Sequence, residues 1–401
     1  MTRGTIAVGA VLVLACTATA ADPGMDAGAG RDGGGDATTR DGGAPDGGAA
    51  IDGGTAAGLE VRAFGVQGFL LTYGGESVMT APLFTRQSTL DVSLNLPIRP
   101  DVTGIDAALA SSDLSTVRAI VSGHAHYDHL LDVVHVMDAL TPSAVLYANR
   151  SAGHIFAALA PDRDPACTSA PAPEVIDRAR VIAVDDPGAS RVDYTNCLDQ
   201  LPPGAPTEGT WTHVPGSRVS LVPVCTTHPS QIGPIHFGAG SVDADLCDLP
   251  RAASGWLEGQ TISFLIDFLA ADGSVAFRVY YQDAPATSPI GQVPAALLDG
   301  HRVDLAILCV GSNDSVTNQP TDIILNLDPR FVLSGHWEDF FQARDQPIRP
   351  IPLLNVDQYV ARAEAALAAP PDAPLVVDGA PIAGRHVLVT PGSRFSVPPP
   401  P

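Results

Sequence analysis

The chain of 401 residues contains no lysine, so all 22 of its basic residues are arginines, and its 44 acidic residues outnumber them. The formal net charge is −22. Proteins that bind nucleic acids gather basic side chains into a patch or stripe, and no stretch of this sequence contains one. A nucleic acid is therefore not an expected partner.

Three further absences narrow the class of protein. The sequence has no Gly-x-Ser-x-Gly nucleophile elbow and no phosphate loop, which argues against the serine hydrolases and nucleotidases that depend on them. After the first 15 residues, no apolar run is long enough to cross a membrane.

The first residues read as an export signal. One arginine precedes an apolar run over residues 5–15, which is too short for a membrane helix of the mature protein. Residues 13–16, Val-Leu-Ala-Cys, fit a bacterial lipobox, in which Cys16 is lipidated and becomes the mature N-terminus. We expect a lipoprotein of the bacterial cell envelope, attached to a membrane in the periplasm or at the outer membrane. The alternative is cleavage after Ala20, which would release a secreted protein.

Composition divides the remainder. Residues 16–58 are mainly Gly, Ala and Asp with repeated Asp-Gly-Gly, which predicts a disordered linker behind the lipidated cysteine. Residues 59–395 are expected to form the folded body, with an insertion at about 160–217 that is rich in Pro, Asp and small residues. Residues 396–401 form a Pro-rich tail. The sequence does not predict an oligomeric state.

Cysteine usage agrees with export. The simplest disulfide pairing joins Cys167 to Cys197 and Cys225 to Cys247, because each pair brackets one irregular stretch. Cys309 lies in the apolar run 305–310, so we expect a free thiol in a buried strand. The sequence does not fix this connectivity.

One cluster dominates the chain: His-Ala-His-Tyr-Asp-His at residues 124–129. It follows the mostly apolar run 117–121, a predicted buried strand, and precedes a predicted helix. Neutral imidazoles and carboxylates are ligands of first-row metals. In an extended turn His124 and His126 point the same way and share one ion, whereas Asp128 and His129 face a second ion. The cluster therefore predicts a metal site.

This cluster resembles the second motif of the metallo-β-lactamase superfamily, and the resemblance extends over about residues 60–341. It implies an α/β fold, a four-layer αβ/βα sandwich with two mixed β-sheets flanked by helices. It also implies two metal ions at one edge between the sheets. Zinc suits imidazole ligands best, and iron and manganese are the alternatives.

Three more predicted strand ends carry residues that match the family's remaining motifs. The resemblance implies that His228 joins His124 and His126 in the first metal site. It implies that His336 joins Asp128 and His129 in the second, with Asp283 bridging both ions. His213 precedes its strand, so we discount it as a ligand. His236 remains the alternative to His228, or a residue that contacts the substrate.

The opening of the body, residues 61–82, reads as two strands joined at Gly74-Gly75. It looks like the branch that contains L-ascorbate-6-phosphate lactonase and N-acyl-phosphatidylethanolamine phospholipase D. In that branch an Asp precedes the proline, and this Asp supports the metal site from behind. Here Ala81 precedes Pro82, so this outer carboxylate is absent.

The resemblance implies hydrolysis by a hydroxide that bridges two zinc ions, with Asp128 binding the second ion and orienting the nucleophile. A phosphodiester, a lactone or another ester is the expected substrate, either a small molecule or lipid-derived. Substrate contacts are expected at His236, Tyr127 and Asn313. The alternative is a non-catalytic surface lipoprotein that retains the fold, and Ala81 is the feature in its favour.

Overall fold

The computed structural model describes residues 57–186 and 211–401. The predicted signal segment, the predicted lipidation site at Cys16, almost all of the predicted linker and Cys197 lie outside the described residues. Residues 55–401 form one unit. Among the described residues, no helix is both long and apolar enough to cross a membrane.

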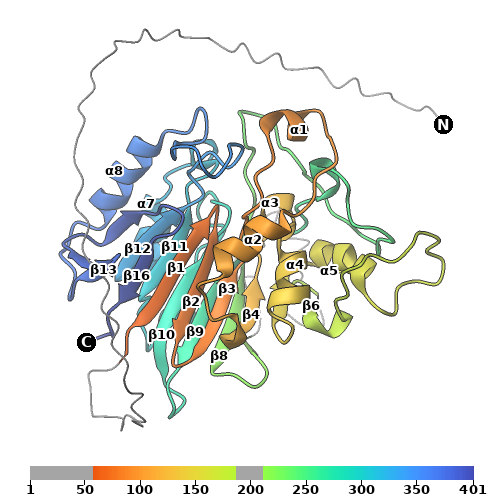
Figure 1. Ribbon diagram of the computed structural model, residues 1–401. Coiled ribbons are helices and arrows are strands. Elements are labelled where there is room, and N and C mark those ends of the chain that lie inside the picture. The colour runs from red at the N-terminus through yellow and green to blue at the C-terminus, as the bar shows by residue number, and fades with distance from the viewer. Residues whose placement is uncertain (1–56, 187–210) are drawn as a thin grey trace, which may run out of the picture. The chain divides into compact units, whose positions relative to one another are not determined.

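The first sheet is built on the predicted opening hairpin (Figure 1). Gly74 and Gly75 both adopt positive φ, 58° and 79°, and join its two strands, as their sequence predicted. The residues before Gly74 were predicted as one strand, but they form two, Leu59–Gly65 and Gly68–Tyr73, because the chain turns at Val66 and Gln67. The sheet has nine strands in the order β14-β13-β16-β1-β2-β3-β4-β5-β6. Their bounds are β14 Ala380–Ile382, β13 Leu375–Val377, β16 Arg394–Val397, β1 Leu59–Gly65, β2 Gly68–Tyr73, β3 Glu76–Thr80, β4 Val117–Val121, β5 Val145–Ala148 and β6 Val181–Ala183.

The second sheet has seven strands in the order β15-β12-β11-β10-β9-β8-β7. Its central strands β9 and β11 are buried along nearly their whole length, as expected for strands covered on both faces. Their bounds are β15 His386–Leu388, β12 Phe331–Gly335, β11 Leu305–Cys309, β10 Val275–Tyr281, β9 Ile262–Leu269, β8 Val219–Cys225 and β7 Thr212–His213.

Helices cover the outer face of each sheet (Figure 1). One helix was predicted after the histidine cluster, but the helical segment begins within the cluster, at Tyr127. It is divided into two short α-helices, Tyr127–Leu130 and Val133–His135, and a π-helix over Val136–Leu140. The longest helix is α8, Val356–Ala366. The other α-helices are α1 Thr89–Ser93, α2 Val102–Leu109, α3 Tyr127–Leu130, α4 Val133–His135, α5 Arg150–Phe156, α6 Ala295–Leu298 and α7 Thr321–Leu327.

Three apolar cores separate these layers. One packs the first sheet against its helices and includes Ile120 of β4 and Ile155 of α5. A second lies between the two sheets, and a third packs the second sheet against α7 and α8 through residues such as Leu308 and Tyr359. This arrangement of helix, sheet, sheet and helix confirms the predicted four-layer αβ/βα sandwich.

Strand direction places the carboxyl ends of several strands at one edge. Strands β3 to β6 run parallel in the first sheet, and β10, β11 and β12 run parallel in the second. Because β8 and β10 both pair antiparallel with β9, β8 points the same way as β10. The two edges meet where the amide of Ile262 donates to the carbonyl of Gly123 at 2.8 Å. The strand ends that carry the predicted ligands therefore face one another.

The C-terminal region belongs to both sheets. Strands β13, β14 and β16 extend the first sheet, and β15 extends the second, although the family resemblance ends near residue 341. Ser396 and Val397 pair with Glu60 and Leu59 of β1. The predicted tail from residue 396 therefore begins two residues too early, because burial of Val397 holds this end in the sheet.

Both predicted disulfide pairings are wrong. Cys167 pairs with Cys247, with 5.3 Å between their Cα atoms, and Cys225 is also disulfide-bonded. The loop that carries Cys247 packs on the start of the predicted insertion, where its carbonyl accepts a hydrogen bond from Arg163 at 2.9 Å. The two cysteines are 80 residues apart in the sequence, and they pair because the fold brings them together in space. Cys309 is a buried free thiol, as predicted.

Candidate metal centre

Four strand ends supply the seven predicted ligands. The loop after β4 carries His124 and His126, the first turn of α3 carries Asp128 and His129, and the three other residues follow β8, β10 and β12. These side chains form two groups whose candidate ligand atoms lie within 4.8 Å of one another, and Asp283 lies beside both. The structure therefore brings together all seven residues that the sequence singled out.

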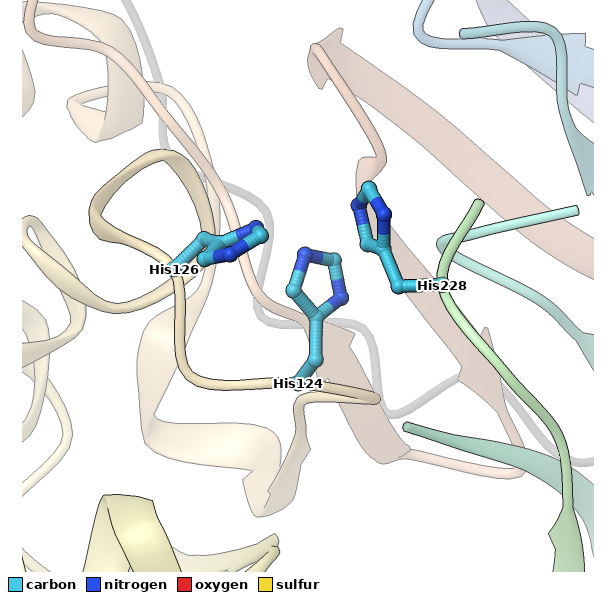
Figure 2. A group of neighbouring side chains, drawn as sticks. All are labelled: His124, His126 and His228. Carbon is cyan, nitrogen blue, oxygen red and sulfur yellow. The ribbon is translucent and has the colours of Figure 1, made fainter. Parts of the chain in front are cut away.

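The first group consists of His124, His126 and His228 (Figure 2). The rings of His124 and His126 come from one turn and lie 4.6 Å apart between centroids. His228 approaches from the opposite sheet, 4.7 Å from His124 and 4.9 Å from His126. Its Nδ1 donates to the carbonyl of Pro229 at 2.7 Å, which leaves Nε2 as the free nitrogen.

The second group consists of Asp128, His129 and His336. His336 Nε2 lies 3.3 Å from Asp128 Oδ2, and His129 Nε2 lies 3.6 Å from the same oxygen. His336 has a φ of 58°, a left-handed conformation that non-glycine residues rarely adopt, and its amide donates to the carbonyl of Val66 at 2.6 Å. Such a conformation, held by a neighbouring strand end, is common at functional sites.

Asp283 lies between the two groups. Its Oδ1 is 3.1 Å from His124 Nδ1, and its Oδ2 is 3.6 Å from His129 Nδ1. The amide of Gly123 donates to Oδ2 at 2.7 Å, which fixes the orientation of the carboxylate. One carboxylate oxygen thus lies beside a histidine of each group.

Burial sets the protonation of these groups. It lowers the pKa of His126 to about 3 and that of His129 to about 4, so both imidazoles are neutral at physiological pH. It raises the pKa of Asp283 to about 6. Burial would also raise the pKa of Asp128, but neighbouring His129 and the hydrogen bond from His336 hold it well below its usual range.

The donor set fits divalent metal ions of the zinc type. His124 Nε2, His336 Nδ1 and both ring nitrogens of His129 are buried without a hydrogen-bond partner in the described structure. Buried polar atoms are nearly always satisfied, so such a concentration of unpartnered imidazole nitrogens calls for a ligand. Neutral imidazoles with one or two carboxylates are the usual ligands of zinc and non-haem iron.

A substitution at Gly123 tests the packing around Asp283 directly. A Cβ atom here would overlap Asp283 Oδ1 and the carbonyl oxygen of Ile262. We expect Gly123→Ala to lower the free energy of unfolding by about 1–3 kcal/mol, as overpacking commonly does, and to weaken metal binding. Urea unfolding and metal content measure both effects. Gly153→Ala is the control, because Gly153 lies in α5 with open space around it. This substitution should instead raise the free energy of unfolding by about 0.5–1 kcal/mol. Equal effects at the two glycines would contradict this description.

Sequence reasoning missed several buried carboxylates around the centre. Asp132 accepts hydrogen bonds from the amides of Phe84 and Thr85 at 2.6 and 2.7 Å, which fixes the loop after β3. Glu338, two residues beyond His336, accepts from the amide of Val66. Ala81 is buried in the apolar core beside the helices. No sequence signal marked these carboxylates, because the groups that they contact lie far along the chain.

The residues predicted to contact substrate lie in different surroundings. His236 is half-buried, and its ring stacks on that of His228 with 5.4 Å between centroids. Its Nε2 lies 2.6 Å from Glu258, another carboxylate that was not predicted. Tyr127 lies in the apolar core beside the helices, and Asn313 is fully buried after β11. Of the three, the structure places only His236 beside a ligand group at partial exposure.

Comparisons with known proteins find similarity only among solved structures. No family model and no curated protein matches the chain. It is similar to isothiocyanate hydrolase from Delia radicum gut bacteria (12% identity, 84% of this chain and 99% of that chain, TM-score 0.43). It is also similar to a metallo-β-lactamase fold protein from Bacillus subtilis (10% identity, 84% of this chain and 98% of that chain, TM-score 0.42). A metallo hydrolase from Ignicoccus hospitalis is similar as well (14% identity, 84% of this chain and 97% of that chain, TM-score 0.40). A proposal about function therefore rests on the residues of this chain.

Proposed function

We propose that the chain is a metal-dependent hydrolase of the metallo-β-lactamase superfamily that holds two metal ions, preferably zinc, and cleaves a phosphodiester, a lactone or another ester. One observation carries this proposal: two groups of three ligands converge from four strand ends, with the two oxygens of Asp283 directed one to each group. Two bound ions would polarise the substrate and lower the pKa of a water between them toward neutrality.

The residues of the chain would prepare this site before any substrate enters. Burial keeps the imidazoles of His126 and His129 neutral, so their ring nitrogens are available as ligands. Asp128 remains ionised because its pKa is well below the usual range. Such a weak base is better suited to accept a hydrogen bond from the attacking water than to take its proton, so Asp128 would orient the nucleophile.

An apolar segment beside the first group favours a substrate with an apolar portion. Ile232, Ile235 and Phe237 are 50%, 39% and 55% exposed, and they lie in the loop that runs from His228 past His236. Neighbouring exposed apolar side chains commonly mark a binding surface. They support a lipid-derived substrate. The Cys167–Cys247 disulfide and the disulfide-bonded Cys225 support export to an oxidising compartment.

The proposal is tested by hydrolysis of bis-p-nitrophenyl phosphate and of an aliphatic lactone by the full chain, with metal content measured on the same sample. We expect turnover of one of them that a chelator abolishes and zinc restores. His126→Ala should abolish this turnover, whereas His213→Ala, an exposed histidine of β7, should leave it unchanged. Two bound ions without turnover of either substrate would contradict the hydrolase and favour the non-catalytic alternative.

A further inference from the structure

A third group of candidate ligands adjoins the first. His228, His236 and Glu258 also have ligand atoms within 4.8 Å of one another. Two imidazoles and one carboxylate make up the protein ligands of many catalytic zinc sites and of non-haem iron sites, where further coordination positions stay open. His236 is partly exposed, so this group faces solvent, whereas His124 of the first group is buried.

The backbone fixes Glu258 beside the ligand turn. Its amide donates to the carbonyl of Gly238, and its carbonyl accepts from the amide of Ala125, both at 2.9 Å. The side-chain amide of Asn149 donates to the same carbonyl at 2.6 Å. Three hydrogen bonds from three separate segments thus hold the residue in place. Its carboxylate is presented to the histidines by a rigid backbone.

The surroundings of the Glu258 carboxylate lack a permanent cation. The residue is 8% exposed, and in the described part of the chain its ion-pair partners are His236 at 2.6 Å and His126 at 3.9 Å, with no arginine among them. Burial of a carboxylate is costly unless a positive charge compensates it. A metal ion would supply that charge.

His228 belongs to both groups and can serve only one at a time. Its Nδ1 donates to Pro229, so Nε2 alone is free to bind an ion. The His228 ring lies 4.7 Å from that of His124 on one side and 5.4 Å from that of His236 on the other. A single nitrogen cannot bind two ions. The two groups are therefore alternative positions for one ion.

We propose that His228, His236 and Glu258 form an outer binding position for a divalent metal ion such as Zn²⁺, in exchange with an inner position formed by His124, His126 and His228. The inference rests on metal binding by the first group but not on hydrolysis. The outer position gives an ion three ligands near the surface before it reaches the buried inner position, and it can retain the ion when an inner ligand is lost.

The test removes an inner ligand and counts the ions that remain. In the full chain, His126→Ala leaves all three outer ligands in place, and equilibrium dialysis against Zn²⁺ should still show two ions per chain. Adding Glu258→Gln should release one of them. The affinity for that ion should fall at least as far as the roughly 10- to 100-fold that loss of an outer-shell partner costs. Asp106→Asn in the same background is the control, because Asp106 pairs with His135 in the same way, at 2.8 Å, away from both groups.

Two results would overturn the outer position. One is a His126→Ala chain that binds a single ion, and the other is a Glu258→Gln substitution that leaves Zn²⁺ affinity in that background unchanged. Circular dichroism checks the fold, and His124→Ala provides a second inner variant for the same cycle. The metal content of the unaltered chain separates this inference from the proposed function. Fewer than two ions per unaltered chain would contradict the two-ion centre. If the unaltered chain binds two ions, the ion counts of the variants decide whether the outer position exists.

Discussion

Asp283→Asn is expected to lower kcat/KM of the proposed hydrolase by at least about 10³-fold, which corresponds to about 4 kcal/mol of transition-state stabilisation. The two oxygens of Asp283 face the two ligand groups, at 3.1 Å from His124 Nδ1 and 3.6 Å from His129 Nδ1. An amide replaces one of these oxygens with an NH₂ group that has no lone pair for a metal. Steady-state kinetics with excess zinc measure the loss, and undiminished turnover would contradict a bridging role.

The same substitution should stabilise the metal-free chain at neutral pH. Burial raises the pKa of Asp283 to about 6, so the folded chain binds this proton more tightly than the unfolded chain does. The contribution of Asp283 to the stability of the metal-free chain should therefore decrease as pH rises from about 4 to about 6. The variant should avoid this loss and gain on the order of 2–3 kcal/mol at pH 7.5. Urea unfolding at pH 4 and 7.5 checks the sign.

Asp272→Asn is the matched control for both measurements. Asp272 lies on an exposed turn, where its carboxylate accepts a hydrogen bond from Ser274. Its substitution should change neither turnover nor the slope of stability against pH between 4 and 6. An Asp283→Asn chain that is less stable than the unaltered metal-free chain at pH 7.5 would contradict the electrostatic account of this carboxylate.

Removal of metal is the second large effect. A ligand that binds only the folded chain stabilises it by about 4 kcal/mol per site when its free concentration is 1,000 times Kd. A chelator should therefore lower Tm by several degrees and abolish turnover, and added zinc should restore both. The decrease in Tm on chelation should be smaller in a His336→Ala chain, because that variant retains only the first ligand group. Calorimetry measures these shifts, and an unchanged Tm would show that the imidazoles bind no ion.

The order and direction of strands explain why so much of the centre could be predicted. Ligands at strand ends occupy positions that the local pattern reveals: an apolar run stops, and His228, Asp283 or His336 follows. Parallel strands then carry these ends to a shared edge, as β10 and β12 do. Prediction of the site thus required only local patterns and one family resemblance.

The parts that could not be predicted depend on contacts between loops. Glu258 lies outside regular structure, and its position follows from hydrogen bonds to Gly238, Ala125 and Asn149. The Cys167–Cys247 disulfide depends on the same region of loops. No periodicity marks such contacts. At Ala81 the family pattern predicts a carboxylate that this chain lacks. The structure places the alanine in an apolar core.

The central claim is that two ion sites share Asp283, and metal content per chain tests it most directly. Zinc would be counted in the full unaltered chain and in two variants after dialysis against the same free zinc concentration. The account predicts two ions in the unaltered chain, one in His228→Ala, which lacks the first site, and one in His336→Ala, which lacks the second. No bound ion in the unaltered chain, or a count that neither substitution changes, would contradict it.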